Sequence, residues 1–164
     1  TPYKDEQIKC AFLFSVFTGL RWSDIKRLTW QDLKEDENGK YFHIRMKKTA
    51  KPISVYLSST GAQFLPERTT GNENGLIFTL PNNTSVNTHV RRWCKEAGIT
   101  KQVCFHVARH TFGTMMLNND VPLEVVSKMM GHTKLSTTEI YAKLLNRTIA
   151  SAAHKQDAIF KDLI

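Results

Sequence analysis

This 164-residue chain lacks the features that mark several protein classes. Its three cysteines, Cys10, Cys94 and Cys104, are far apart and form no C-x-x-C pattern, which argues against a disulfide framework and a zinc ribbon. A reduced, cytosolic setting fits them best. The most apolar run, from Cys10 to Leu20, is too short to span a bilayer, and no secretory signal pattern is visible. We therefore expect a cytoplasmic protein with no membrane partner.

Acidic residues are too few to balance the basic ones. The chain has 23 Lys and Arg against 15 Asp and Glu, a net charge of +8. In a single domain this excess points toward nucleic acid or another polyanion, and the alternative is a basic but inert surface.

Glycine and proline are also scarce, at 8 and 5 residues, and there is neither an internal repeat nor a low-complexity linker. We expect residues 1–164 to form one domain with its own core. Because the first residue is Thr1, we expect the chain to be an excised or processed piece of something longer.

The first third of the chain predicts two helices and a small antiparallel sheet. Residues 4–17 are apolar almost all round, as in a buried helix, and Gly19 is a plausible end. Ser23 resembles the N-cap of a short second helix. Strands are predicted between Leu33 and Leu57, where an Asn-Gly turn signal and the β-rich runs "YFHIRM" and "ISVYL" flank "KKTAKP".

The rest of the chain predicts helices. Ser58 or Ser59 can cap one helix. Further apolar repeats and stop signals predict helices at Val86–Ala97, at Phe105–Leu117, from Pro122 to Gly131, around Ile140 and Tyr141, and in an amphipathic tail over residues 146–164.

The stretch "FHVARHTFG" offers three candidate ligands on one helix. His106 and His110 are four residues apart, which invites a metal site, but the zinc-protease pattern requires Glu where Val107 stands. We therefore expect no metal. Arg109, three residues after His106, is well suited to hold a phosphate, although a salt bridge to an acid would also explain it.

Three other candidates come from separate parts of the chain. Arg21, in "FTGLRWSDI", follows a buried helix, so its charge needs an anionic partner, either Asp24 or a ligand. Lys48, beside Thr49, is a weak signal alone. Tyr141 ends "GHTKLSTTEIY", nine residues after His132.

Together these residue types suit phosphodiester chemistry. Two Arg and a His can neutralise the non-bridging oxygens of the transition state, a Tyr can attack phosphorus, and a Lys can protonate the leaving oxygen. Neighbouring cations are expected to lower the pKa of the Tyr141 hydroxyl.

Four motifs, "TGLRWSDI", "KKT", "HVARHTF" and "GHTKLSTTEIYA", occur in this order and resemble the conserved boxes of the tyrosine recombinase (phage integrase) family. The resemblance covers essentially the whole chain, as that family's C-terminal catalytic domain, with the N-terminal core-binding domain absent. It implies an α+β, mainly α-helical fold with a small three-stranded antiparallel sheet.

The resemblance also implies a role for each matching residue. Arg21, Arg109 and His132 would clamp the scissile phosphate, and His106 would assist phosphate binding and proton transfer. Lys48 would be the general acid, with Lys47 as the fallback, and Tyr141 the nucleophile that forms a 3′-phosphotyrosyl intermediate. Asp24 would support Arg21, and His110 would be structural.

The implied activity is site-specific DNA recombination, for integration or excision of a bacterial mobile element, without cofactor or metal. Double-stranded DNA would be the partner, a tetramer the active complex, accessory DNA-bending proteins further candidates, and the nucleoid the location. The tail, with Ile159, Phe160 and Leu163, would dock on a neighbouring protomer or on its own domain. The alternatives are a catalytically silent DNA-binding module and a phosphate-binding domain unrelated to DNA.

Overall fold

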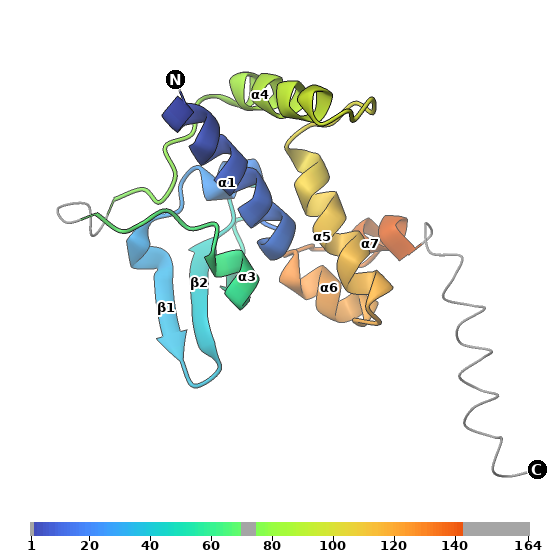
Figure 1. Cartoon of the computed structure of the whole chain (residues 1–164). Helices are drawn as coiled ribbons and strands as arrows, with labels where there is room; N and C mark the ends of the chain where they lie inside the picture. Colours follow the sequence, from blue (N-terminus) through green and yellow to red (C-terminus); the bar gives the residue numbers. More distant parts are fainter. Residues whose placement is uncertain (1, 70–74, 143–164) are drawn as a thin grey trace, which may run out of the picture.

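The structure is a computed structural model that describes residues 2–69 and 75–142 (Figure 1). Its elements are, in chain order, α1 (Pro2–Thr18), α2 (Trp22–Ile25), the 3-10 turn η1 (Trp30–Asp32), β1 (Leu33–Asp36), β2 (Gly39–Arg45), β3 (Pro52–Tyr56), α3 (Ser59–Ala62), α4 (Asn83–Glu96), α5 (His106–Asn118), α6 (Leu123–Met129) and α7 (Ser136–Ala142). The predicted mainly helical fold with a three-stranded antiparallel sheet is confirmed.

The sheet has strand order β1-β2-β3, and both pairings are antiparallel. Alternate residues of β2 and β3 are buried, as expected where one face of a sheet covers a core. The register places Phe42 opposite Val55 and Ile44 opposite Ile53. The Asn-Gly turn predicted from the sequence joins β1 to β2, and Gly39 has a φ of 116° there.

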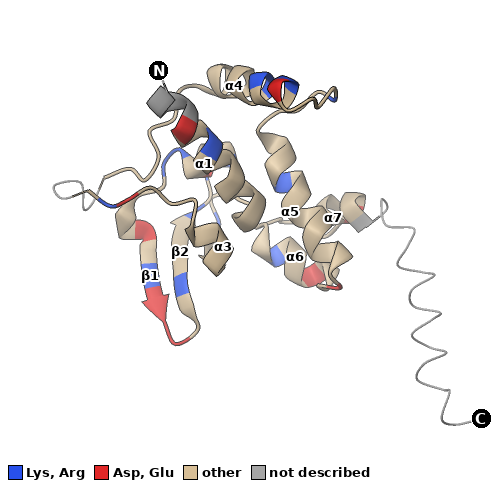
Figure 2. Ribbon diagram, in the orientation of Figure 1, with Lys and Arg blue, Asp and Glu red and all other residues tan. Residues whose placement is uncertain are grey.

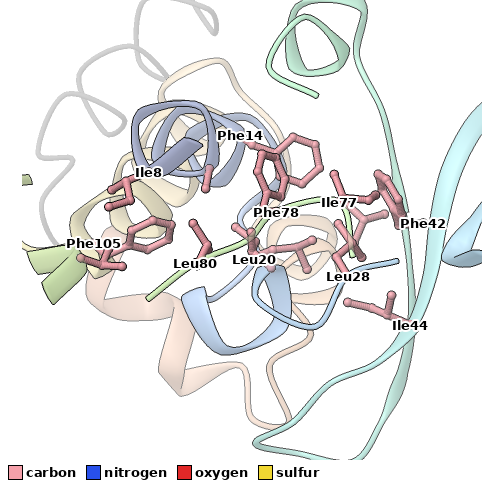
Figure 3. Close-up of a cluster of buried hydrophobic side chains, with 14 of the residues drawn as sticks. Ile8, Phe14, Leu20, Leu28, Phe42, Ile44, Ile77, Phe78, Leu80 and Phe105 are labelled. Carbon is pink, nitrogen blue, oxygen red and sulfur yellow. The ribbon is translucent and has the colours of Figure 1, made fainter. Parts of the chain in front are cut away.

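The main core lies between α1, the sheet and the segment before α4 (Figure 3). Phe14 of α1 contacts Phe42 of β2 edge to face, with ring centroids 5.9 Å apart, and Phe78 at 5.5 Å. A second cluster joins α5, α6 and α7 and consists of Phe112, Val126, Met130 and Tyr141. Burying each large side chain stabilises the fold by about 1.5–3 kcal/mol, so α7 is attached to the domain largely through Tyr141.

Glycines were predicted to end two helices, and both predictions are confirmed, for the C-terminal ends of α1 and α6. Gly19 and Gly131 have positive φ angles of 68° and 62°, the left-handed conformation that glycine adopts most easily. Ser58 caps α3 by accepting a hydrogen bond from the Gly61 amide at 3.0 Å.

One predicted cap is wrong. Ser23 lies inside α2, and the residue at the N-cap is Arg21, whose extended backbone precedes the helix and whose side chain makes no capping bond. The helix starts earlier because the Arg21 carbonyl accepts the amides of Asp24 and Ile25, at 2.9 and 3.0 Å, which places Trp22 and Ser23 within the first turn.

The predicted C-terminal tail lies outside the described residues. Within residues 2–69 and 75–142, no helix combines the length and the apolar character needed to cross a membrane.

Candidate phosphate-binding and nucleophile site

Arg109 is the most deeply buried charged residue of the site, with 1% of its surface exposed. Its guanidinium donates one hydrogen bond to the carbonyl of Gly19 and another to the carbonyl of Met130, the latter at 2.6 Å. It therefore joins the end of α1 to the end of α6. Burial, reinforced by the charge of Arg21, lowers the pKa of Arg109 to about 10, so it remains a cation at neutral pH.

Arg21 lies directly after the α1 end that Arg109 holds. Its Nη1 atom is buried and has no hydrogen-bond partner in the described part of the chain. Burial lowers the pKa of Arg21, while the charge of Asp24 acts in the opposite direction. A buried guanidinium nitrogen without a partner is costly, so the site is suited to an anion that would supply the missing acceptor.

A cavity of about 310 Å³ lies in front of both arginines. Arg21, Arg109 and His106 line it, together with residues of α1, α2 and α4 and the segment before α5. Two cationic side chains at the wall of one cavity are suited to a phosphate group.

His132 follows Gly131 and is fixed by α7. Its Nδ1 atom lies 2.8 Å from the hydroxyl of Thr138, which is buried. Burial, followed by the charges of Arg109, Arg21, His106 and Lys48, lowers the pKa of His132 to about 4. A neutral His132 with Nδ1 accepting from Thr138 would carry its proton on Nε2 and could donate it to an anion.

Tyr141 is 3% exposed, and its ring lies 5.2 Å from the His110 ring. Its pKa is raised, because burial outweighs the opposing charges of Arg109 and Arg21. The expectation of a lowered pKa is therefore wrong in direction. The cations act as expected, but the sequence did not show how much of the Tyr141 side chain is buried in the folded protein.

His106 and His110 pack against each other on α5, with ring centroids 4.6 Å apart. Burial is the main cause of the lowered pKa of each ring, and Arg109 contributes to both. Within residues 2–69 and 75–142, no third His, Cys, Asp or Glu joins them in a group that could hold a metal ion.

Lys47 and Lys48 lie in the turn between β2 and β3. The charge of Lys48 contributes to the lowered pKa values of both His106 and His132, whereas Lys47 is not among the causes of either shift. The backbone amide of Lys47 donates to Asp24 Oδ1 at 2.8 Å. Lys48 is thus the lysine of the pair whose charge acts on two histidines of the site.

The structure therefore gathers the sequence candidates around one region. Asp24 acts on Arg21 through its charge, which opposes the lowering of the Arg21 pKa. Among the described residues no ion pair joins the two side chains, and Asp24 Oδ1 lies 3.8 Å from Arg27 Nη2. Sequence reasoning missed Thr138. The available signal was its position three residues before Tyr141, which places both on one face of α7.

Gly131 connects α6 to His132 in a space with no room for a side chain. A Cβ atom there would lie 2.2 Å from Met46 Sδ, in a backbone conformation with a φ of 62°. We expect Gly131→Ala to lower the free energy of unfolding by about 2–4 kcal/mol, the sum of left-handed strain and overpacking. Thermal unfolding checks this value.

Gly98→Ala is the matched control, because Gly98 has a φ of 74° but no atom within 4 Å of its added Cβ. Only the conformational part, about 1 kcal/mol, is expected there. Equal losses in the two variants would show that Met46 moves freely and that the packing argument is wrong.

Protonation of His132 is expected to destabilise the DNA-free protein in acid. Its pKa of about 4 in the folded state lies below the ordinary value of 6.5, so the unfolded chain binds the proton more tightly. Its contribution to stability is present above pH 6.5 and is lost as pH falls toward 4. His132→Gln should flatten the decline of the melting temperature over that range, and an unchanged decline would contradict the assignment.

Charge is unevenly distributed over the molecule (Figure 2). Acidic residues gather at the far end of β1, where Glu35, Asp36 and Glu37 are exposed, while Lys and Arg are spread over the strands, α4, α5 and α6. The acidic end of β1 lies away from α5, the helix that carries Arg109.

Known proteins are similar to this chain in sequence. The integrase of Salmonella phage P22 is 29% identical over 94% of this chain and 44% of its own length. A tyrosine recombinase of Pseudothermotoga lettingae is 30% identical over 85% of this chain and 50% of its own. The chain thus spans about half the length of these curated relatives.

Solved structures confirm the architecture. The XerA recombinase superposes with a TM-score of 0.71 at 22% identity, covering 94% of this chain and 58% of that one. XerH bound to its difH substrate gives 0.68 at 21%, covering 90% and 46%. The lambda integrase dimer bound to a COC′ core site gives 0.65 at 18%, covering 82% and 51%.

The profile of the phage integrase family matches residues 2–147. This match covers all four sequence motifs and every candidate residue of the site from Arg21 to Tyr141. It confirms the resemblance inferred from the sequence. The chain belongs to the phage integrase family.

Proposed function

We propose that this chain is the catalytic domain of a site-specific DNA recombinase that cuts and rejoins strands through a 3′-phosphotyrosyl intermediate. The observation that carries the proposal is the unpartnered Nη1 of Arg21, which is buried beside Arg109 and His106 at one cavity. The charges of both arginines also act on Tyr141. A phosphodiester would complete this set, since it supplies acceptors to the arginines and an electrophile to the tyrosine.

Each residue then has a chemical role. The Tyr141 oxygen attacks phosphorus, forming the phosphotyrosyl bond as the bond to the 5′ oxygen breaks. Lys48 gives a proton to the departing oxygen, which leaves as a 5′-hydroxyl. Arg21, Arg109 and neutral His132 stabilise the charge that builds on the non-bridging oxygens. His106, which lines the same cavity as both arginines, assists phosphate binding and the transfer of the tyrosine proton.

The raised pKa of Tyr141 is consistent with this mechanism. Before DNA binds the hydroxyl is neutral, and burial raises its pKa further above its ordinary value. In the reaction the proton leaves as the new bond to phosphorus forms, so a stable phenolate is not required. Rejoining is the reverse step, in which a 5′-hydroxyl attacks the phosphotyrosine.

Double-stranded DNA is the proposed partner. The net charge of +8 supports it, as does the similarity to XerH and lambda integrase, which were solved bound to difH and to a core site. We further propose assembly as a tetramer on DNA, with accessory DNA-bending proteins, and action on a bacterial mobile element at the nucleoid. The similarity to the phage P22 integrase favours that setting.

Covalent trapping tests the proposal even though the target sequence is not known. A DNA site is first selected from a randomised duplex library by binding to the complete natural protein. The site is then made as a series of duplexes with one nick at successive positions, so that a short cleaved fragment diffuses away. We expect an adduct that resists SDS and is removed by protease. Salt-sensitive binding without an adduct at any nick position would identify a silent DNA-binding module.

A further inference from the structure

Asp24 of α2 and Arg27, just after α2, bind the backbone where β2 leads into the turn that contains Lys48. Asp24 Oδ1 accepts the Lys47 amide at 2.8 Å, and Arg27 Nη2 donates to the Arg45 carbonyl at 3.1 Å. These bonds fix the backbone on both sides of Met46, whose side chain is buried. Asp24 and Arg27, 3.8 Å apart, are called here the α2 bracket.

The bracket completes the support of the turn between β2 and β3. Within the hairpin, the Ala50 amide donates to the Met46 carbonyl at 2.9 Å, and the Arg45 guanidinium donates to the Ala50 carbonyl at 2.8 Å. These bonds close the turn on itself but do not attach it to the rest of the domain. The bracket attaches it to the segment that also carries Arg21.

The burial of the two members shows different roles. The Asp24 side chain is fully buried, and its Oδ2 atom has no hydrogen-bond partner in the described residues, whereas half of the Arg27 side chain is exposed. A buried carboxylate holding a backbone amide is a strong, charge-assisted contact. Arg27 closes the contact from the solvent side, so it can be replaced with little effect on the core.

We propose that the α2 bracket positions Lys48 for proton transfer to the leaving 5′ oxygen. Asp24 and Arg27 are positioning residues, since neither is placed at the reacting atoms. The step they support moves one proton from the Lys48 ammonium to the oxygen that takes the electrons of the broken P–O bond. The inference rests on the proposed function. It adds that hydrogen bonds from Asp24 and Arg27 connect the segment that carries Arg21 to the turn that carries the general acid.

A sulfur-substituted substrate isolates that proton transfer. In a 5′-bridging phosphorothiolate the leaving atom is sulfur. A thiol has a pKa of about 8.5, whereas water ionises only at about 15.7. Departure of sulfur therefore needs no acid. Cleavage rates are compared for the complete natural protein on matched nicked duplexes with oxygen or sulfur at the selected site.

The expected pattern is specific to proton transfer. Lys48→Met should slow cleavage of the oxygen substrate by about 10²–10⁴-fold and leave the sulfur substrate within about twofold. Arg27→Met should slow the oxygen substrate by about tenfold or more, again with recovery on sulfur. Adding Arg27→Met to Lys48→Met should cause no further loss, because both changes remove one function.

Lys40→Met is the matched control. It removes a cation from β2, the strand whose end the α2 bracket holds, but Lys40 is not part of the bracket. Its ratio of sulfur to oxygen rates should equal that of the wild type. The inference is overturned if Arg27→Met slows both substrates equally, changes neither rate, or adds its full loss to Lys48→Met. If the wild type forms no adduct on either substrate, the proposed function itself has failed.

Discussion

Tyr141→Phe is expected to reduce the covalent DNA adduct by at least about 10³-fold, to the level of background. The change removes the single oxygen that would bond to phosphorus, and no remaining group can form the intermediate in its place. The ring, which packs with Phe112, Val126 and Met130, is retained. The fold and the cationic cavity should therefore survive the substitution.

DNA affinity separates loss of chemistry from loss of binding. The Tyr141→Phe variant should bind the selected duplex within about twofold of the wild type, because the phosphate contacts come from other side chains. Gel-based adduct detection and fluorescence anisotropy on the same samples check both values. An adduct that persists in the variant would show that another residue is the nucleophile.

Arg109→Met is expected to slow adduct formation by about 10³–10⁵-fold, the range found for arginines that stabilise a phosphoryl transition state. The change removes the guanidinium group, which lines the cavity and donates hydrogen bonds to the carbonyls of Gly19 and Met130. Arg109→Lys is the matched variant, because it keeps the charge but cannot reach both carbonyls at once. It should recover only part of the rate.

The same substitution should change stability far less than the burial of Arg109 suggests. Losing two charge-assisted bonds costs about 3–6 kcal/mol. Removing a buried cation that has no ion-pair partner among residues 2–69 and 75–142 recovers about 3 kcal/mol, which corresponds to its lowered pKa of about 10. The net loss should be below about 3 kcal/mol, as measured by urea unfolding. A larger loss would make Arg109 chiefly a structural residue.

Much of the fold could be predicted because its signals are local. The Asn-Gly turn, Gly19 and Gly131 each act through neighbouring backbone conformation, and the alternation in β2 is visible in its own residues. The cap at Ser23 was wrong because serine is only a preferred cap residue, and here the backbone of Arg21 starts the helix without any side-chain cap.

The candidate site also has features that the sequence predicts and features that only the structure shows. Residue types and their order identified Arg21, Arg109, His132 and Tyr141, but the pKa of Tyr141 depends on burial that forms only when α5, α6 and α7 pack. The contacts of Arg109 with two backbone carbonyls leave no trace in the sequence, since any residue supplies a carbonyl. The bond from Asp24 to Lys47 spans 23 positions and needed the structure as well.

The central claim is that Tyr141 becomes joined to the 3′ phosphate of the cleaved strand, and peptide mapping of the trapped adduct tests it most directly. After digestion with nuclease and protease, mass spectrometry should find a nucleotide on the peptide that contains Tyr141, and the released strand should carry a 5′-hydroxyl that a kinase labels with no phosphatase treatment. A nucleotide on any other residue, or a released strand that ends in a 5′-phosphate, would contradict the account.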